Sequence, residues 1–237
     1  MNKSMNEPVK ESVSDPVNRT VIGPENGPVN EPVNELGSTE PDRQKRDCSS
    51  KAGARVPVRF LEGEKVYLRP VDTGDTETYF RQLFQPQTRK LTGTQKHFTR
   101  NQIERYIEGK AQDTSSILLL IALTETDEVI GDIALQDIDG YNRSAGIRIS
   151  IDSSRNQGKG CGTEALNLML DYGFGIVNLH RIELNVFAYN ERALHVYEKI
   201  GFKKEGVQKE ALYYNHKYHD SILMAILEHE YRELHGL

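Results

Sequence analysis

The sequence predicts an α+β fold with the element order β-α-α-β-β-β-α-β-α-β-β. Two observations carry this prediction. Apolar segments of strand length follow one another with short turns between them, as in antiparallel strands. Two amphipathic stretches with helical spacing then alternate with strands, and the first of these follows a glycine-rich turn. One right-handed β-α-β crossover is therefore expected inside an otherwise antiparallel sheet.

Residues 1–54 differ in composition from the rest of the chain. Pro-Val followed by a polar residue recurs there, no aromatic residue precedes Phe60, and Leu36 is the only leucine before that point. Such a segment buries too little apolar surface to offset an ordering entropy of ~1–2 kcal/mol per residue. We expect a disordered tail over residues 1–54 and one folded domain over residues 55–237.

The first elements of the domain are a strand and two helices. Residues 65–69 alternate like a strand that ends near Pro70. Residues 75–84 have the pattern of a polar-faced helix. The stretch from Thr99 to Gln102 has the spacing of a capping box, so a second helix is expected over residues 100–112.

The rest of the domain is expected to contain six more strands and two more helices. Asn190 is suited to cap a short helix, and Gly201 is suited to end it in the left-handed conformation. A longer helix runs from the glycine-rich turn to about Val177. The expected strands cover residues 117–123, 129–135, 145–151, 181–187, 206–213 and 218–227.

The glycine-rich turn is the most informative segment. Gly158, Gly160 and Gly162 lie between the strand that ends at Ile151 and the following helix. The first turn of a helix leaves N–H groups unpaired at the positive end of its dipole. This arrangement favours an anion, and a phosphate-bearing ligand in particular.

Two familiar phosphate motifs fit the turn poorly. A P-loop requires Lys followed by Ser or Thr, whereas Lys159 is followed by Gly160. A dinucleotide fingerprint requires a later third glycine, and Glu183 falls near the start of its strand rather than at its end. A tight loop without any ligand stays open as an alternative.

Two signatures resemble those of the GCN5-related N-acetyltransferase (GNAT) family. The first is Arg155-x-x-Gly158-x-Gly160, and the second is Asn190-x-x-Ala193-x-x-x-Tyr197-x-x-x-Gly201-Phe202. The resemblance covers residues 60–230 and is strongest to the spermidine/spermine and ribosomal-protein N-terminal acetyltransferase branches. It implies a mixed, mostly antiparallel central sheet with helices on both faces.

The resemblance also implies acetyl-CoA as cosubstrate. Main-chain amides of the turn would hold its pyrophosphate, the preceding strand would pair with its pantetheine arm, and Asn190 would add a contact. The implied cofactor-binding residues are Ile149, Ser150, Ile151, Gln157, Gly158, Lys159, Gly160, Cys161, Gly162, Thr163 and Asn190.

For the chemistry, the resemblance places Tyr197 as general acid at the departing sulfur. A core tyrosine on an apolar helix face is the alternative interpretation. Asp137 and Asp139 are candidates for the base by location only. Cys161 is not expected to be catalytic, although a helix start would favour its thiolate, and no metal site is predicted.

The acceptor stays open between a small amine such as a polyamine and a protein N-terminus. A polyamine would require an acidic pocket, for which the first two helices offer Asp75, Glu77, Glu104 and Glu108. A non-catalytic CoA-binding module is the alternative from another class, and a homo-oligomer is open as well.

Composition limits the other partners. A net charge of −5 gives no reason to expect nucleic acid. No apolar run approaches the ~20 residues that span a bilayer, and the N-terminus lacks the apolar core of a secretory signal. We therefore expect no membrane partner and a cytoplasmic protein. The two cysteines do not suggest a disulfide framework.

Overall fold

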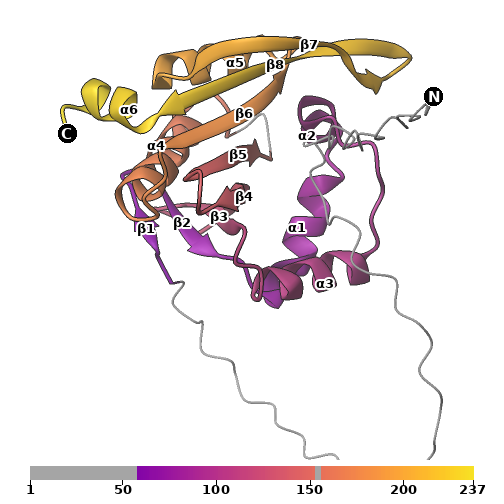
Figure 1. Ribbon diagram of the computed structural model, residues 1–237. Coiled ribbons are helices and arrows are strands. Elements are labelled where there is room, and N and C mark those ends of the chain that lie inside the picture. Colours follow the sequence, from indigo (N-terminus) through magenta and orange to yellow (C-terminus); the bar gives the residue numbers. More distant parts are fainter. Residues whose placement is uncertain (1–57, 153–155) are drawn as a thin grey trace, which may run out of the picture.

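The computed structural model describes residues 58–152 and 156–237. The predicted tail and Arg155 of the first signature lie outside the described residues. An eight-stranded sheet runs through the domain in the order β1-β2-β3-β4-β5-β6-β8-β7 (Figure 1). Its strands are β1 (Leu61–Glu62), β2 (Val66–Pro70), β3 (Ile117–Leu123), β4 (Val129–Asp139), β5 (Ser144–Ile151), β6 (Arg181–Phe187), β7 (Lys203–Tyr214) and β8 (Lys217–Leu227).

Every neighbouring pair of strands is antiparallel except β5 and β6, which are parallel. The predicted α+β class with one crossover is therefore confirmed. The helices are the short 3-10 helix η1 (Thr73–Asp75), α1 (Thr76–Leu83), α2 (Pro86–Thr92), α3 (Arg100–Lys110), α4 (Cys161–Gly175), α5 (Glu191–Ile200) and α6 (Glu228–His235).

The structure adds four short elements that the sequence pattern does not predict, namely β1, η1, α2 and α6. Helix α2 begins with Pro86 in its first turn and ends at Gly93, whose φ of 66° is left-handed. Its only buried residue is Thr88, so it has no apolar stripe to reveal it. Helix α6 likewise buries only Tyr231. Such elements depend on what they pack against more than on their own periodicity.

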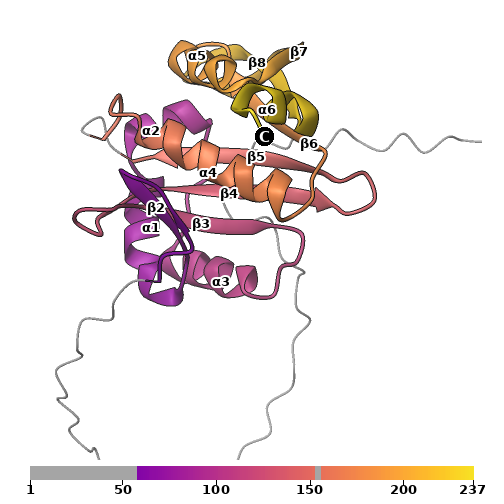
Figure 2. The same ribbon diagram turned by 90° about the vertical axis from the view of Figure 1, so that its left-hand side faces the viewer.

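Helices cover both faces of the sheet, as expected (Figures 1 and 2). On one face, Leu166 and Met169 of α4 and Ile133 of β4 belong to the larger core. On the other face, Tyr79 of α1 and Ile103 of α3 form a second apolar cluster. The sheet is therefore buried on both sides at its centre.

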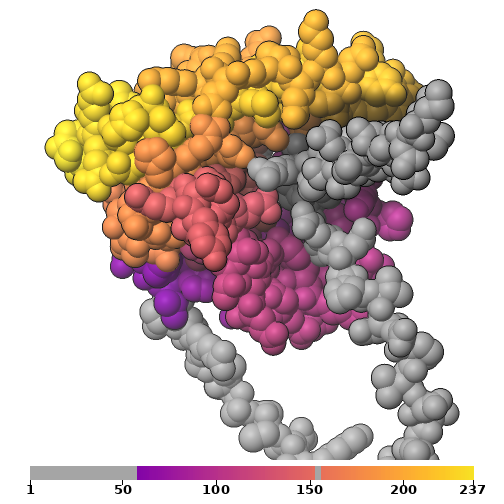
Figure 3. Space-filling view, in the orientation of Figure 1, coloured from indigo at the N-terminus to yellow at the C-terminus, as the bar shows by residue number. Residues whose placement is uncertain are grey.

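The parallel pair separates soon after it starts. Strands β5 and β6 pair only over Ser144–Gly146 and Arg181–Glu183. From Ile147 onward β5 keeps its antiparallel partner β4, but its other edge no longer pairs with β6. This splay opens a space between the two halves of the sheet. In Figure 3, the orange-to-yellow surface of the C-terminal half lies above the magenta surface of α1–α3.

Over residues 58–152 and 156–237, none of the helices combines the length and apolar character that crossing a bilayer would require.

Candidate active site

A cleft with a volume of about 560 Å³ lies at the splay. Its walls come from the glycine-rich turn, from β5 and β6, and from α2 and α5. Most of the predicted site residues line this one cleft: Ile149, Ser150, Ile151, Gln157, Gly158, Gly160, Gly162, Thr163, Asn190 and Tyr197. The two signatures, separated by about thirty positions in the sequence, therefore meet in space.

Two predicted cofactor contacts lie outside the lining. Lys159 is exposed, and its carbonyl oxygen accepts a hydrogen bond from Nζ of Lys65 at 3.2 Å. The side chain of Cys161 is only 4% exposed and belongs to the core beneath α4. Any part that these two residues play in binding through their main-chain amides stays a prediction.

The glycine-rich turn has the backbone that an anion site requires. Gly158 and Gly160 have φ values of 82° and 88°, which L side chains rarely adopt. Gly160 is the N-cap of α4 and offers no side chain to cap it. The first intrahelical amide, that of Glu164, donates to the Gly160 carbonyl at 3.0 Å. The three amides before it are thus the ones that an anion can use.

Gly162 differs from the other two glycines. A Cβ atom there would meet Ile151 Cγ1 at 3.5 Å, which is ordinary contact, and its φ is not left-handed. The fold therefore requires glycine at positions 158 and 160 but not at position 162.

The second signature forms α5 and places Tyr197 in the cleft. The Asn190 side chain accepts a hydrogen bond from the amide of Ala193 at 3.3 Å, and Gly201 ends the helix with a φ of 114°. The half-buried ring of Tyr197 meets Phe202 edge-on, with 5.8 Å between ring centroids. Burial raises the pKa of Tyr197 to about 12, so its phenol keeps its proton at neutral pH.

The structure separates the two candidates for the base. Asp137 is exposed at an irregularity of β4, has a φ of 50°, and lines the cleft. Asp139 instead accepts hydrogen bonds from the amides of Tyr141 and Asn142, at 2.8 and 3.0 Å. The bond from the Asn142 amide leads the contacts that lower the pKa of Asp139. Asp139 thus holds the β4–β5 turn and does not reach the cleft lining.

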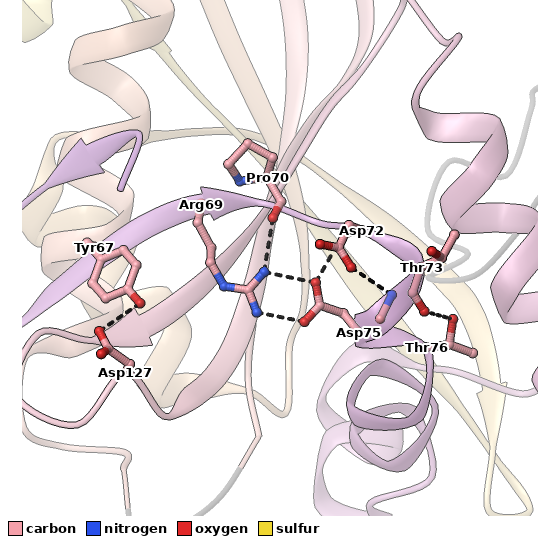
Figure 4. A network of polar contacts seen from close by, with 9 residues as sticks. Tyr67, Arg69, Pro70, Asp72, Thr73, Asp75, Thr76 and Asp127 are labelled. Atoms are coloured by element: carbon pink, nitrogen blue, oxygen red, sulfur yellow. Dashed lines mark hydrogen bonds and ion pairs between the residues drawn. The ribbon is translucent and has the colours of Figure 1, made fainter. Parts of the chain in front are cut away.

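The acidic residues of the first helices do not reach the cleft either. Both carboxylate oxygens of Asp75 accept hydrogen bonds from the guanidinium of Arg69, at 2.6 and 2.8 Å (Figure 4). Glu77 pairs with Arg100 at 2.7 Å. Like Asp75 and Glu77, the other two proposed acids, Glu104 and Glu108, are absent from the lining. The carboxylates that do line the cleft are Asp137 and Glu183.

A buried ion pair beside the cleft was not foreseen from the sequence. The Arg148 guanidinium donates to Asp132 of β4 and, at 3.2 Å, to the hydroxyl of Tyr79 on α1. The side chains of Arg148 and Asp132 are only 10% and 6% exposed. Arg148 also lines the cleft. Charged residues inside alternating strands could have suggested such a pair, but the partner on α1 is set by packing alone.

Arg192 is a second residue that the sequence motifs do not single out as part of the site. It lies at the start of α5, lines the cleft, and donates to the Gln157 side chain at 3.2 Å. A cation therefore stands across from the amides of the glycine-rich turn, which adds to the positive potential where a phosphate would bind.

The model for the acetyltransferase (GNAT) domain matches residues 65–203, more than half of the chain. The chain belongs to the GNAT acetyltransferase family. This GNAT protein is 39% identical to the spermidine N(1)-acetyltransferase of Escherichia coli (strain K12) over 108 residues. That match covers 46% of this chain and 58% of the relative, and thus less than two thirds of its length.

Two further comparisons extend over more of the GNAT protein. The probable N-acetyltransferase YjcK of Bacillus subtilis (strain 168) is 32% identical over 179 residues, 71% of this chain and 97% of the relative. The crystal structure of spermidine N-acetyltransferase from Vibrio cholerae in complex with CoA and spermine has a TM-score of 0.67 and 29% identity. It covers 70% of this chain and 98% of that chain.

Proposed function

We propose that this GNAT protein is an acetyl-CoA-dependent N-acetyltransferase whose acceptor is a polyamine such as spermidine or spermine. One observation carries the proposal: a single cleft joins the uncapped start of α4 to the hydroxyl-bearing ring of Tyr197 and the carboxylate of Asp137. The relatives that are named for spermidine acetylation support the choice of acceptor.

The cofactor end of the cleft fits a pyrophosphate and an extended arm. The left-handed backbone at Gly158 and Gly160 is the conformation from which successive amides form an anion-binding concavity. The edge of β5 that does not pair with β6, over Ile149–Ile151, offers main-chain donors and acceptors to the amides of pantetheine. One such amide would also stabilise negative charge on the thioester oxygen, which is worth ~3–4 kcal/mol in comparable sites.

In the proposed reaction, the lone pair of the acceptor nitrogen attacks the thioester carbonyl carbon. The carbon–sulfur bond then breaks, and its electron pair leaves with sulfur. As the carbon–sulfur bond breaks, the nitrogen gives up its second proton and the thiolate takes up a proton, so the products are the N-acetyl amine and the CoA thiol. An alkyl ammonium has a pKa of ~10.4, so a group must accept a proton before or during attack. We assign this proton to Asp137, because the competing candidate Asp139 holds a turn outside the cleft.

Tyr197 supports the departure of sulfur. Because burial raises its pKa to about 12, its phenol stays protonated and can donate a hydrogen bond to the thiolate that forms. Asn190 contributes by capping α5, which fixes the helix that presents this ring.

The proposal is tested by mixing the full chain with acetyl-CoA and an amine panel while thiol release is followed. The panel contains spermidine, spermine and peptides with free N-termini. Release with the polyamines above that with the peptides is the expected result. Release with peptides alone would favour a protein N-terminal acetyltransferase. CoA binding without release on any amine would favour a non-catalytic CoA-binding module.

A further inference from the structure

Gly146 is a glycine that the fold does not require. It lies inside β5, where a glycine forgoes side-chain packing and weakens the strand. Its φ is not left-handed, and a Cβ atom there would meet only the carbonyl oxygens of Gln136 and Glu183, at 3.8 and 4.0 Å. A side chain would therefore fit both the backbone and its protein neighbours. Gly146 lines the cleft. The effect of having glycine at this position is therefore the space that the missing side chain leaves in the cleft.

This space opens onto the face of the sheet opposite α4. The neighbours Ala145 and Ile147 are buried in the core under α4. Position 146 therefore faces the opposite side, because side chains alternate along a strand. In the sheet register Gly146 pairs with Gln136 on β4 and with Glu183 on β6. The missing side chain thus leaves a notch between Gln136 and Glu183, which we call the Gly146 notch.

The Gly146 notch lies where β5 and β6 begin to separate. The pair Gly146 and Glu183 is the last of the parallel ladder. Beyond it, the free edge of β5 runs toward the glycine-rich turn. A molecule seated in the notch is therefore at the inner end of the same cleft that holds Tyr197.

Two carboxylates flank the Gly146 notch: Glu183 is its register partner on β6, and Asp137 follows Gln136 on β4. Arg181 pairs with Glu183 at 3.1 Å and also with Glu205. The buried Arg148 is matched by Asp132.

Asp137 lines the same cleft and makes no ion pair with any residue in the described part of the chain, so it contributes a negative charge there. An uncharged acyl chain gains nothing from such surroundings, whereas a cation is attracted to them.

We propose that the Gly146 notch receives the second ammonium group of a linear diamine or polyamine while the first nitrogen attacks. This makes Gly146 a specificity-determining residue for acceptors with two or more nitrogens. The inference rests on the proposed acetyltransferase function and deepens it.

The test compares kcat/KM for spermidine with kcat/KM for n-propylamine, which has a single nitrogen. In Gly146→Val the ratio of the two should fall by about tenfold or more, because the branched side chain fills the notch. In Gly146→Ala the ratio should lie between that of Gly146→Val and that of the unsubstituted protein. The matched control is Gly206→Val. Gly206 is a strand glycine with no left-handed φ, a Cβ atom there would meet only Leu223 Cδ1, at 3.6 Å, and the residue is absent from the lining. This control should leave the ratio within about twofold of the unsubstituted protein.

Folding and cofactor binding are followed in parallel by thermal unfolding and by the Kd of CoA. If the Gly146→Val protein folds and binds CoA but keeps the original ratio of kcat/KM values, the proposed role of the notch is overturned. Turnover of spermidine by the unsubstituted protein would still uphold the proposed acetyltransferase function. A change in preference between acetyl-CoA and butyryl-CoA, with the amine ratio unchanged, would assign the notch to the acyl group and also overturn the inference. Should Gly146→Val fail to fold, the ratio in Gly146→Ala decides.

Discussion

Replacing Tyr197 with Phe isolates the contribution of its hydroxyl, because the ring can keep its edge-on contact with Phe202. Burial raises the pKa of Tyr197 to about 12, whereas an ordinary thiol has a pKa of ~8.5. Passing the whole proton to a thiolate is thus uphill by about 5 kcal/mol, at ~1.36 kcal/mol per pKa unit. The hydroxyl is therefore expected to stabilise sulfur as a hydrogen-bond donor, which is worth ~1.5–3 kcal/mol toward a charged acceptor.

This energy predicts a fall in kcat of about 10- to 150-fold in Tyr197→Phe. The Kd of CoA should stay within about twofold, because the donor matters only once charge develops on sulfur. The assay is thiol release at saturating acetyl-CoA and spermidine, with calorimetry for CoA binding. Tyr141→Phe is the matched control, since Tyr141 is fully exposed on the β4–β5 turn.

Two results would refute this account of Tyr197. Unchanged kcat together with weakened CoA binding would make the residue a packing element. A loss beyond about 10⁴-fold would indicate complete proton transfer rather than a hydrogen bond. The pH profile adds a check: a raised pKa keeps the phenol protonated to higher pH, so this residue should cause no alkaline decline below about pH 11. A decline between pH 8 and 10 that disappears in Tyr197→Phe would contradict the assigned pKa.

The remaining predictions concern the base, the glycine-rich turn and the buried ion pair. Asp137→Asn should lower kcat for spermidine by about 10²-fold or more, whereas Asp139→Asn, which alters a turn, should leave kcat nearly unchanged in the same assay. Gly160→Asp should weaken CoA binding by at least about tenfold, measured by calorimetry, because it adds a negative side chain at a φ of 88° beside the proposed anion site. An unchanged affinity for CoA would contradict phosphate binding by the glycine-rich turn. Arg148→Met should lower the free energy of unfolding in urea by ~3–5 kcal/mol, because it leaves the buried carboxylate of Asp132 without its charged partner. Adding Asp132→Asn should recover part of that loss, and strictly additive effects would argue against the pair.

Much of the site could be predicted because its residues are linked by local chemistry. The left-handed backbone of the turn requires glycine at positions 158 and 160. Such a requirement can be read directly from the sequence, because glycine is the residue that adopts this conformation readily. Asn190 and Gly201 mark the two ends of α5 in the same way. Once the ends of a helix are fixed, the position of Tyr197 on it follows from periodicity.

The acceptor end could not be predicted in this way. Asp137 and Asp139 are two residues apart and look alike in the sequence, yet one lines the cleft and the other holds a turn. Asp75 and Glu77 lie on a helix that the sequence predicts to have a polar face, but both pair with arginines outside the cleft. Which carboxylate faces a substrate depends on strand irregularities and on partners far away in the chain.

The sequence by itself determined the order of the main strands and helices, the glycine-rich turn before α4 and the helix that carries Tyr197. These follow from hydrophobic periodicity and from backbone conformations that only certain residues adopt. Only the tertiary structure decided that α2 forms a wall of the cleft, that Arg148 meets Asp132 and Tyr79, and that Gly146 leaves an open notch. Those features arise where β5 and β6 separate, and the separation is a property of strand pairing between distant segments, which no local pattern encodes.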